Sequence, residues 1–148
     1  MENITLVRAY NAALAGAMAA GGDPDVVQAA VDPYLTPGAV CRETPALPWG
    51  GTFTGGSRGI RDLCVAGTAA LVAFAEAAGA PVTAAPDSYA ADGDVVFRTT
   101  AMRFPATPAH EALDVPVIDR YVVADGRIDA IDVFFFDVPA MLDRLAPA

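Results

Sequence analysis

The sequence predicts an α+β fold in which helices pack on one face of a cone-shaped, curved, mostly antiparallel sheet. Two observations support this prediction. Helical periodicity dominates the chain up to Gly79, whereas patterns typical of strands dominate from there onward. One further strand is expected before the last of the early helices. Because a strongly curved sheet closed by helices leaves space inside, we expect an apolar pocket between the two.

Three helices are predicted in the first half of the chain, over residues 4–18, 24–31 and 57–78. Apolar residues recur at helical spacing in the first and third of these segments. Asp23 is a suitable N-cap for the second helix, where it is followed by Pro24, and Ser57 is a suitable N-cap for the third. A short strand is expected over residues 39–44, and the proline- and glycine-rich segment 45–56 is typical of a loop.

Four strands are predicted in the second half, over residues 82–90 and 95–104 and as a pair within residues 115–137. Asp92 and Gly93 are expected to form the turn between the first two strands. Asp125 and Gly126 are expected to join the second two. Asp137 is expected to cap a last short helix.

The composition limits the partners that the protein can bind. A length of 148 residues, with 54% hydrophobic and 18% charged, indicates one globular domain spanning residues 1–148. The net charge of −9 disfavours binding to nucleic acids and to anionic membranes. The chain contains no lysine, which excludes Schiff-base catalysis and Walker-type phosphate binding. Neither a signal peptide nor a membrane span is recognised, so we expect a cytoplasmic protein.

No metal or cofactor is expected. Besides Cys41 and Cys64, only His110 offers a second type of zinc ligand. The two cysteines are therefore expected to be reduced, buried and small hydrophobic residues. His110 lies in a proline-rich connection, where it is either a solvated loop residue or a member of the site.

Asp119 is the strongest candidate for a functional residue, because it lies in an otherwise apolar strand. Alternation places its side chain on the same face as Val117 and Tyr121. Burying a carboxylate beside apolar residues costs several kcal/mol unless it is paired, hydrogen-bonded or protonated. A carboxyl group with a displaced pKa is suited to proton transfer. The alternative is a structural ion pair with an arginine of a neighbouring strand, such as Arg98 or Arg103.

Three passages carry a resemblance to a known family: LVRAY (6–10), VCRETPALPWGGTFTGGSRGI (40–60) and VIDRYVVADGRIDAIDVFFFD (117–137). In this order they resemble nuclear transport factor 2-like proteins, in the branch that contains ketosteroid isomerase and the SnoaL-like polyketide cyclases. The resemblance implies the curved sheet, an apolar pocket and a homodimer formed through the outer face of the sheet. Because this fold hosts many functions, the resemblance constrains the fold more than the reaction.

The resemblance also implies roles for individual residues. In ketosteroid isomerase one carboxylate moves the proton, while a tyrosine and a protonated aspartic acid donate hydrogen bonds to the oxyanion. Tyr10 matches that tyrosine, and Asp119 matches that aspartic acid and also the acid/base aspartate of the SnoaL-like cyclases. The general base falls at Glu43, where the isomerase has aspartate, or at Arg42 or Thr44 if the alignment shifts by one residue. The simpler alternatives are a core role for Tyr10 and an exposed Glu43.

Five further residues are expected to contact the substrate: Trp49, Val117, Tyr121, Phe97 and Phe135. Val117 and Tyr121 share the face of Asp119. Trp49 either reaches the mouth of the pocket or anchors its own loop. Phe135 belongs to a run of three phenylalanines, so one face of that strand is expected to line the pocket and the other to pack on a helix or a partner subunit.

The resemblance disfavours one reaction of the fold. Limonene-epoxide-hydrolase-like members need an aspartate on the last strand, where this chain has Val133 or Phe134, with Asp132 facing the other way. Asp132 is, like Asp129 and Asp137, expected to be a surface or capping residue.

Two functions remain in competition. The first is a cofactor-independent acid/base enzyme, an isomerase or an aldol-type cyclase, that acts on a small hydrophobic carbonyl or polyketide-like substrate. The second is a protein that binds a small hydrophobic molecule in the same pocket without converting it. A third reading, a scaffold for protein partners, has no surface motif in its favour.

Overall fold

The computed structural model describes residues 2–146, which form an α+β structure with helices on one face of a seven-stranded sheet. The helices are α1 (Glu2–Ala19), α2 (Pro24–Val31), a short 3-10 helix (Asp32–Tyr34), α3 (Ser57–Ala78) and α4 (Val138–Leu145). The strands are β1 (Leu35–Glu43), β2 (Gly51–Phe53), β3 (Thr83–Ala84), β4 (Ser88–Asp92), β5 (Val95–Phe104), β6 (Leu113–Ala124) and β7 (Arg127–Phe135).

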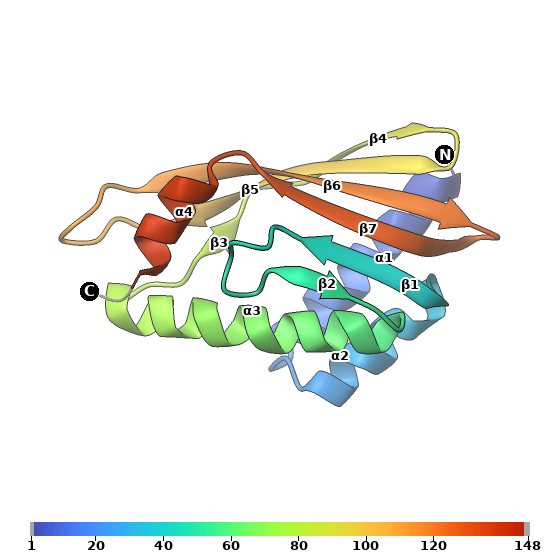
Figure 1. Ribbon diagram of the computed structural model, residues 1–148, viewed down its shortest axis with the longest axis horizontal. Coiled ribbons are helices and arrows are strands. Elements are labelled where there is room, and N and C mark those ends of the chain that lie inside the picture. The colour runs from blue at the N-terminus through green and yellow to red at the C-terminus, as the bar shows by residue number, and fades with distance from the viewer. Residues whose placement is uncertain (1, 147–148) are drawn as a thin grey trace.

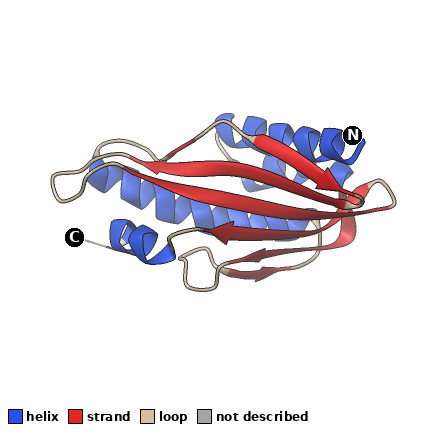
Figure 2. Ribbon diagram, turned by 90° about the horizontal axis from the view of Figure 1, so that it is seen from above, coloured by secondary structure: helices blue, strands red, loops and turns tan. Residues whose placement is uncertain are grey.

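The sheet has the strand order β2-β1-β7-β6-β5-β3, and β4 also pairs with β5. All pairs are antiparallel except β1 with β7, which run parallel. Helices α1, α2 and α3 lie under one face of the curved sheet, and α4 lies beside one end of α3 (Figure 1). The view from above shows the opposite face of the long strands without a covering helix (Figure 2). We call the covered face the inner face and the other the outer face. The predicted α+β fold class is confirmed.

Two of the three predicted helix caps are confirmed. The Asp23 carboxylate accepts hydrogen bonds from the backbone N–H groups of Asp25 and Val26, and the Asp137 carboxylate accepts one from Ala140. The predicted cap of α3 is wrong, because Gly56 occupies the N-cap position at φ 60°. A side chain there would collide with the Thr36 carbonyl, so the position suits only glycine. Ser57 instead donates its hydroxyl to a carboxylate oxygen of Asp32, 2.6 Å away.

Three strand predictions need correction. The first strand begins at Leu35 rather than Ala39, and its register to β7 shifts between Leu35 and Val40. The predicted loop contains the short strand β2, which pairs with the end of β1. The segment predicted as one strand over 82–90 forms two, β3 and β4, and the break includes Pro86, which has no N–H to donate. The turn before β5 is formed by Gly93 and Asp94, one residue later than predicted.

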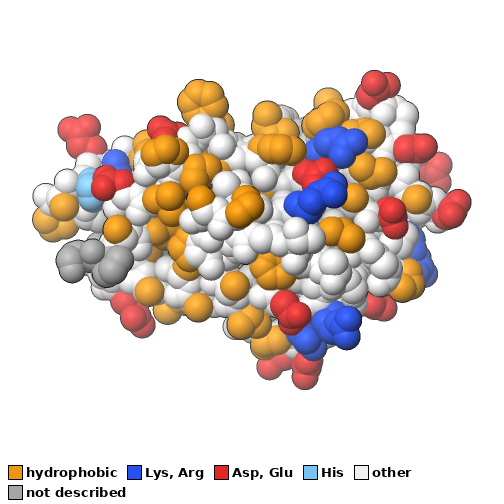
Figure 3. Space-filling model, in the orientation of Figure 1, with side chains coloured by type: hydrophobic (Ala, Val, Ile, Leu, Met, Phe, Trp, Pro, Cys, Tyr) orange, Lys and Arg blue, Asp and Glu red, His pale blue; other side chains and the backbone are white. Residues whose placement is uncertain are grey.

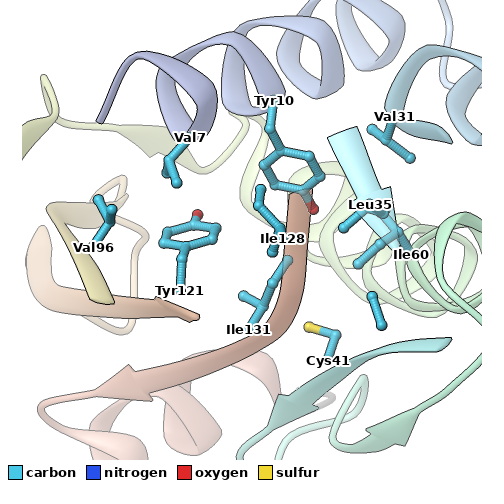
Figure 4. Packing of buried hydrophobic residues seen from close by; sticks show 11 residues of the cluster. Val7, Tyr10, Val31, Leu35, Cys41, Ile60, Val96, Tyr121, Ile128 and Ile131 are labelled. Carbon is cyan, nitrogen blue, oxygen red and sulfur yellow. The ribbon is translucent and has the colours of Figure 1, made fainter. Parts of the chain in front are cut away.

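Two apolar clusters fill the space between the sheet and the helices. The first packs α1, α2 and the start of α3 on the sheet through Val7, Tyr10, Val31, Leu35, Ala39, Cys41, Ile60, Val96, Tyr121, Ile128 and Ile131, most of which Figure 4 labels. The second packs the later part of α3 and α4 on the sheet through Leu47, Trp49, Phe74, Phe104, Val115 and Met141. Leu63 contacts both clusters from the middle of α3.

The outer face carries several exposed apolar side chains, namely Phe97, Ile118 and Phe134. They lie on three neighbouring strands, since Ile118 pairs with Phe134 and β5 runs on the other side of β6. Among residues 2–146, no helix is both long enough and apolar enough to cross a membrane.

Candidate active site on the inner face of the sheet

The strand register brings Glu43, Val133 and Asp119 side by side on the inner face. Asp119 of β6 pairs with Val133 of β7. Strand β1 runs parallel to β7 with Arg42 opposite Asp132, so the next residue of β1, Glu43, lies beside Val133. Neighbouring strands lie about 4.8 Å apart, which places the backbones of Glu43 and Asp119 roughly 10 Å from each other. We call Glu43, Val133 and Asp119 the carboxyl row.

The Asp119 side chain is buried and held by two donors. The residue is only 5% exposed. Its Oδ2 accepts a hydrogen bond from Nη1 of Arg98 at 2.8 Å and another from the Tyr121 hydroxyl at 3.1 Å. Arg98 lies directly opposite Asp119 on β5. The ion pair with Arg98, which was the alternative to a functional role, is therefore present in the structure.

Arg98 is shared between two carboxylates. Its Nη2 donates to Oδ1 of Asp87 at 2.9 Å, and the Tyr89 hydroxyl donates to the other oxygen of Asp87. Its Nε is buried and has no hydrogen-bond partner among residues 2–146. One guanidinium thus compensates the charge of both Asp119 and Asp87. When both carboxyl groups are ionised, the three side chains together carry an excess of negative charge.

This incomplete compensation shows in the pKa of Asp119. Burial raises the pKa of the carboxyl, and the charge and hydrogen bonds of Arg98 and Tyr121 lower it. The net result is a pKa above its usual value, because burial raises it by more than Arg98 and Tyr121 lower it.

Glu43 points inward and holds a proton at neutral pH. Burial and the negative charge of Asp119 raise its pKa to about 8, against a hydrogen-bond contribution from Trp49 that lowers it. Its Oε2 is buried, and no described residue forms a hydrogen bond with it. Arg42, the neighbour on which a shifted alignment would fall, has a 56% exposed side chain on the outer face. The inward residue of this pair is therefore Glu43, a neutral carboxylic acid with a free oxygen.

Tyr121 links Asp119 to helix α1. Its hydroxyl lies 3.2 Å from Oδ1 of Asn11, and Nδ2 of Asn11 donates to the Val7 carbonyl at 3.0 Å. The single hydroxyl proton is donated either to Asp119 or to Asn11, so this chain of polar atoms has two arrangements.

Tyr10 lies near this chain but is not part of it. Its ring packs edge-on against Tyr121, with centroids 6.1 Å apart, and the two rings extend from α1 and from the sheet as Figure 4 shows. Within residues 2–146 the Tyr10 hydroxyl makes no hydrogen bond, and burial raises its pKa. The tyrosine that contacts Asp119 is thus Tyr121. The role that the resemblance implies for Tyr10, a hydrogen bond to the oxyanion, stays a prediction.

The residues expected to contact a substrate divide between the two faces. Trp49 is 5% exposed and packs edge-on against Phe135, with ring centroids 6.2 Å apart. Phe135 pairs with the buried Val117, next to the carboxyl row, so Trp49, Phe135 and Val117 lie on the inner face with Tyr121. Phe97 is 37% exposed on the outer face, because it alternates with the buried Val96. The prediction for Phe97 is corrected accordingly.

Asp132 also departs from its prediction. It faces outward as expected, but it is only 8% exposed and is not a simple surface residue. Nε of Arg42 lies 2.5 Å from its Oδ1, and Nη1 of Arg120 lies 3.1 Å from its Oδ2. These hydrogen bonds lower the pKa of Asp132 below its usual value. Asp129 is exposed and Asp137 caps α4, as predicted.

The carboxyl row lies outside the two cavities described below, so the expected apolar pocket around it stays a prediction. The cavities found among residues 2–146 include one of about 830 Å³ beside the end of α3 and one of about 540 Å³ beside α2, and neither contains Glu43 or Asp119. His110 lines the larger of them, so it does not enter the carboxyl row. The inner face near the row is closed by apolar side chains, among which Trp49 is the largest.

No group of three or more His, Cys, Asp or Glu residues within the described part of the chain is arranged to hold a metal ion. Cys41 and Cys64 are free, and burial raises the pKa of both thiols, to about 11 for Cys64. Thiols with such pKa values are poor nucleophiles at neutral pH.

Comparison with known proteins concerns the fold. No family model matches the sequence, and no curated protein sequence matches it significantly. TerC, co-crystallised with polyporic acid, superimposes with a TM-score of 0.69 at 16% identity, over 98% of both chains. An NTF2-like protein of unknown function from Burkholderia pseudomallei gives a TM-score of 0.71 at 14% identity, over 99% of both chains. A protein assigned as a SnoaL-like polyketide cyclase from Jannaschia sp. gives 0.58 at 18% identity, over 99% of this chain and 94% of that one. Helices under one face of a curved, mostly antiparallel sheet, in this order along the chain, are thus the nuclear transport factor 2-like fold.

Proposed function

We propose that this protein is a cofactor-independent acid/base enzyme, an isomerase or an aldol-type cyclase, that acts on a small hydrophobic carbonyl compound. One observation carries the proposal. A neutral Glu43 and an arginine-paired Asp119 lie on either side of Val133, on an otherwise apolar inner face. Two carboxyl groups in different protonation states are what simultaneous proton removal and proton donation require.

The proposed reaction passes through an enolate. A carboxylate oxygen of Asp119 takes a proton from the carbon next to the carbonyl, and the electrons of that C–H bond move toward the carbonyl oxygen. Glu43 donates its hydrogen bond to that oxygen as the negative charge develops there. Asp119 then returns the proton to another carbon, which gives isomerisation. Alternatively, the enolate carbon bonds to a second carbonyl carbon, and the oxygen of that carbonyl takes the proton from Asp119, which gives an aldol product. No external oxidant or reductant is needed.

The surroundings of the row favour an apolar substrate. Trp49, Phe135 and Val117 present aromatic and aliphatic surface beside the two carboxyl groups. Two proteins with the same fold, TerC in complex with polyporic acid and the SnoaL-like polyketide cyclase from Jannaschia sp., support a small organic ligand. Because Trp49 fills the space next to Glu43, we infer that its loop moves outward when the substrate enters.

A test of this proposal measures proton removal directly. We would incubate the protein in D₂O with a panel of small cyclic ketones and enones and follow deuterium incorporation next to the carbonyl by mass spectrometry. We expect incorporation above background for the wild type and a loss of about 100-fold or more in both Glu43→Gln and Asp119→Asn. Asp132→Asn is the matched control, since it changes an equally buried aspartate on the outer face, and its rate should stay near that of the wild type.

A second function, ligand binding without conversion, is favoured by the Arg98 pair. An aspartate that already accepts a hydrogen bond from an arginine is satisfied without a substrate. In that case no ketone or enone would exchange, while Asp119→Asn would change only the affinity for an apolar ligand.

We also propose that the protein forms a homodimer through the outer face, where Phe97, Ile118 and Phe134 are exposed on neighbouring strands. An exposed apolar patch of this kind is typical of an interaction surface. Light scattering should give the mass of a dimer for the wild type and of a monomer for Phe134→Glu. Val72→Glu, at an exposed position of α3, should remain dimeric.

A further inference from the structure

A second pocket lies at the end of the molecule formed by the last turns of α3, the connection between β5 and β6, and α4. Its volume is about 830 Å³, which falls within the range of small-molecule sites. One wall consists of Ala73, Phe74 and Ala77 of α3, and the opposite side includes Pro108 and Leu145. Ala73 and Ala77 are exposed, so their small side chains leave room beside the Phe74 ring. Figure 3 shows this end at its left margin, where apolar side chains lie beside acidic, basic and histidine side chains.

The wall of this pocket is anchored in the core. Phe74 is buried and packs edge-on against Phe104, with ring centroids 5.4 Å apart. On the other side, Nη1 of Arg144 donates to the Glu111 carbonyl and so ties α4 to the connection between β5 and β6. The pocket is therefore bounded by elements that are fixed to one another.

The polar groups at the rim indicate what kind of ligand fits. His110 Nδ1 lies 3.7 Å from Oδ2 of Asp143, which is too long for a hydrogen bond. Within residues 2–146 the His110 ring makes no hydrogen bond, so it is free to bind a ligand hydroxyl. Asp143 and Arg144 bring one charge of each sign, and the whole chain carries a net charge of −9. These charges favour an uncharged ligand over an anionic one.

We propose that this pocket binds an uncharged aromatic alcohol, with the ring against Phe74 and the alanines of α3 and the hydroxyl hydrogen-bonded to His110. The site is independent of the carboxyl row, with which it shares no residue. Ala77 lies ten residues beyond Gly67, the α3 residue next to Trp49, and this corresponds to about 15 Å along the helix.

The experiment is a titration of ¹⁵N-labelled protein with 2-naphthol at pH 7, followed by two-dimensional NMR. We expect shifts of the backbone amides of residues 73–78, 107–110 and 143–146. Ala77→Trp fills the pocket and should weaken this binding at least tenfold. Ala73→Trp is a second variant with the same expectation. Ala69→Trp is the matched control, because it places the same side chain at an exposed position of α3 outside the pocket, and its affinity should be unchanged.

Two comparisons test the chemistry of the ligand. His110→Leu should reduce the affinity for 2-naphthol several-fold but leave that for naphthalene unchanged. The anion 2-naphthoate should bind at least tenfold more weakly than 2-naphthol.

The proposal is overturned if Ala77→Trp and Ala73→Trp bind 2-naphthol like the wild type, or if the NMR shifts are confined to the carboxyl row. It is also overturned if the same amides shift with protein concentration alone, since a second copy of the chain would then occupy the pocket. Glu43→Gln leaves this binding intact, so its outcome is separable from that of the proposed reaction.

Discussion

Asp119 and Asp132 occupy neighbouring positions on opposite faces of one sheet, and their carboxyl groups behave in opposite ways. Asp132 pairs with Arg120, the residue after Asp119, so the two aspartates are one register step apart. They are almost equally buried, at 5% and 8% exposure. Nevertheless the pKa of Asp119 is raised and that of Asp132 is lowered.

The first cause of the difference is desolvation, which is the largest influence on the pKa of Asp119 but is outweighed at Asp132 by the hydrogen bond from Arg42. The second cause is the number of arginines for each carboxylate. Asp132 has Arg42 and Arg120 to itself, and the side chains of both arginines reach solvent, at 56% and 38% exposure. Asp119 shares the single Arg98 with Asp87. Burial of an aspartate is therefore not by itself a sign of function. The informative feature is burial with too little positive charge nearby, since the pKa of such a carboxyl group is raised.

Replacing Arg98 on the inner face and Arg42 on the outer face should give the largest difference in the free energy of unfolding. Arg98→Met leaves two carboxylates without their shared partner, and we expect a loss of about 3 to 5 kcal/mol in the free energy of unfolding. Arg42→Met removes an exposed arginine from a carboxylate that keeps Arg120, and we expect a loss of about 1 kcal/mol or less. Urea denaturation at pH 7 measures both values. Equal losses in the two variants would show that the faces do not differ in charge compensation.

The raised pKa of Glu43 should make stability fall with rising pH. The ordinary pKa of a glutamic acid is 4.5, and that of Glu43 in the folded protein is about 8. Between these values the folded state binds a proton that the unfolded state has released, so the free energy of unfolding decreases as the pH rises through this window. Allowing for partial exposure, we expect Glu43 to contribute on the order of 3 kcal/mol to this decrease.

Glu43→Gln removes this contribution, because its side chain does not titrate. Its free energy of unfolding should therefore fall less steeply than that of the wild type between about pH 5 and pH 8. Parallel curves for the two proteins in urea denaturation would contradict the assignment of the raised pKa to Glu43.

Asp132→Asn should have a smaller effect with the opposite pH dependence. The lowered pKa of Asp132 means that its ion pairs stabilise the folded state above the ordinary pKa, and that this contribution is lost as the pH falls. We expect the variant to be about 1 kcal/mol less stable than the wild type at pH 7. The difference should shrink as the pH falls below the ordinary aspartate value of 3.8. A difference that persists in acid would indicate packing rather than charge.

Local patterns predict much of this fold, and long-range pairing explains the rest. Asp23 and Asp137 mark helix starts through their own side chains, and alternation along β6 is enough to place Asp119 inside. The parallel pairing of β1 with β7 joins residues far apart in the sequence, so no local pattern shows that Glu43 and Asp119 share a row. Only the resemblance to known proteins suggested it.

Local sequence patterns do not predict which residues pair with the two aspartates, for the same reason. Alternation predicts that Asp132 faces outward, but its burial depends on arginines from two other strands. The sharing of Arg98 with Asp87 depends on a pairing of β4 with β5 around a turn whose position differed by one residue from the prediction. Likewise, alternation within β5 alone could not tell which of Val96 and Phe97 faces inward, because both are apolar.

The central claim is that the inner face raises the pKa of its carboxyl groups, so that Glu43 holds a proton at neutral pH, whereas the outer face lowers the pKa of Asp132. Carbon-detected NMR of protein labelled at the side-chain carboxyl carbons follows each titration separately. We predict a midpoint near pH 8 for Glu43 in the wild type, a lower midpoint for Glu43 in Asp119→Asn, and a midpoint for Asp132 below the ordinary aspartate value of 3.8. A Glu43 midpoint near 4.5, unchanged by Asp119→Asn, would contradict the account, because the inner face would then carry two ordinary carboxylates.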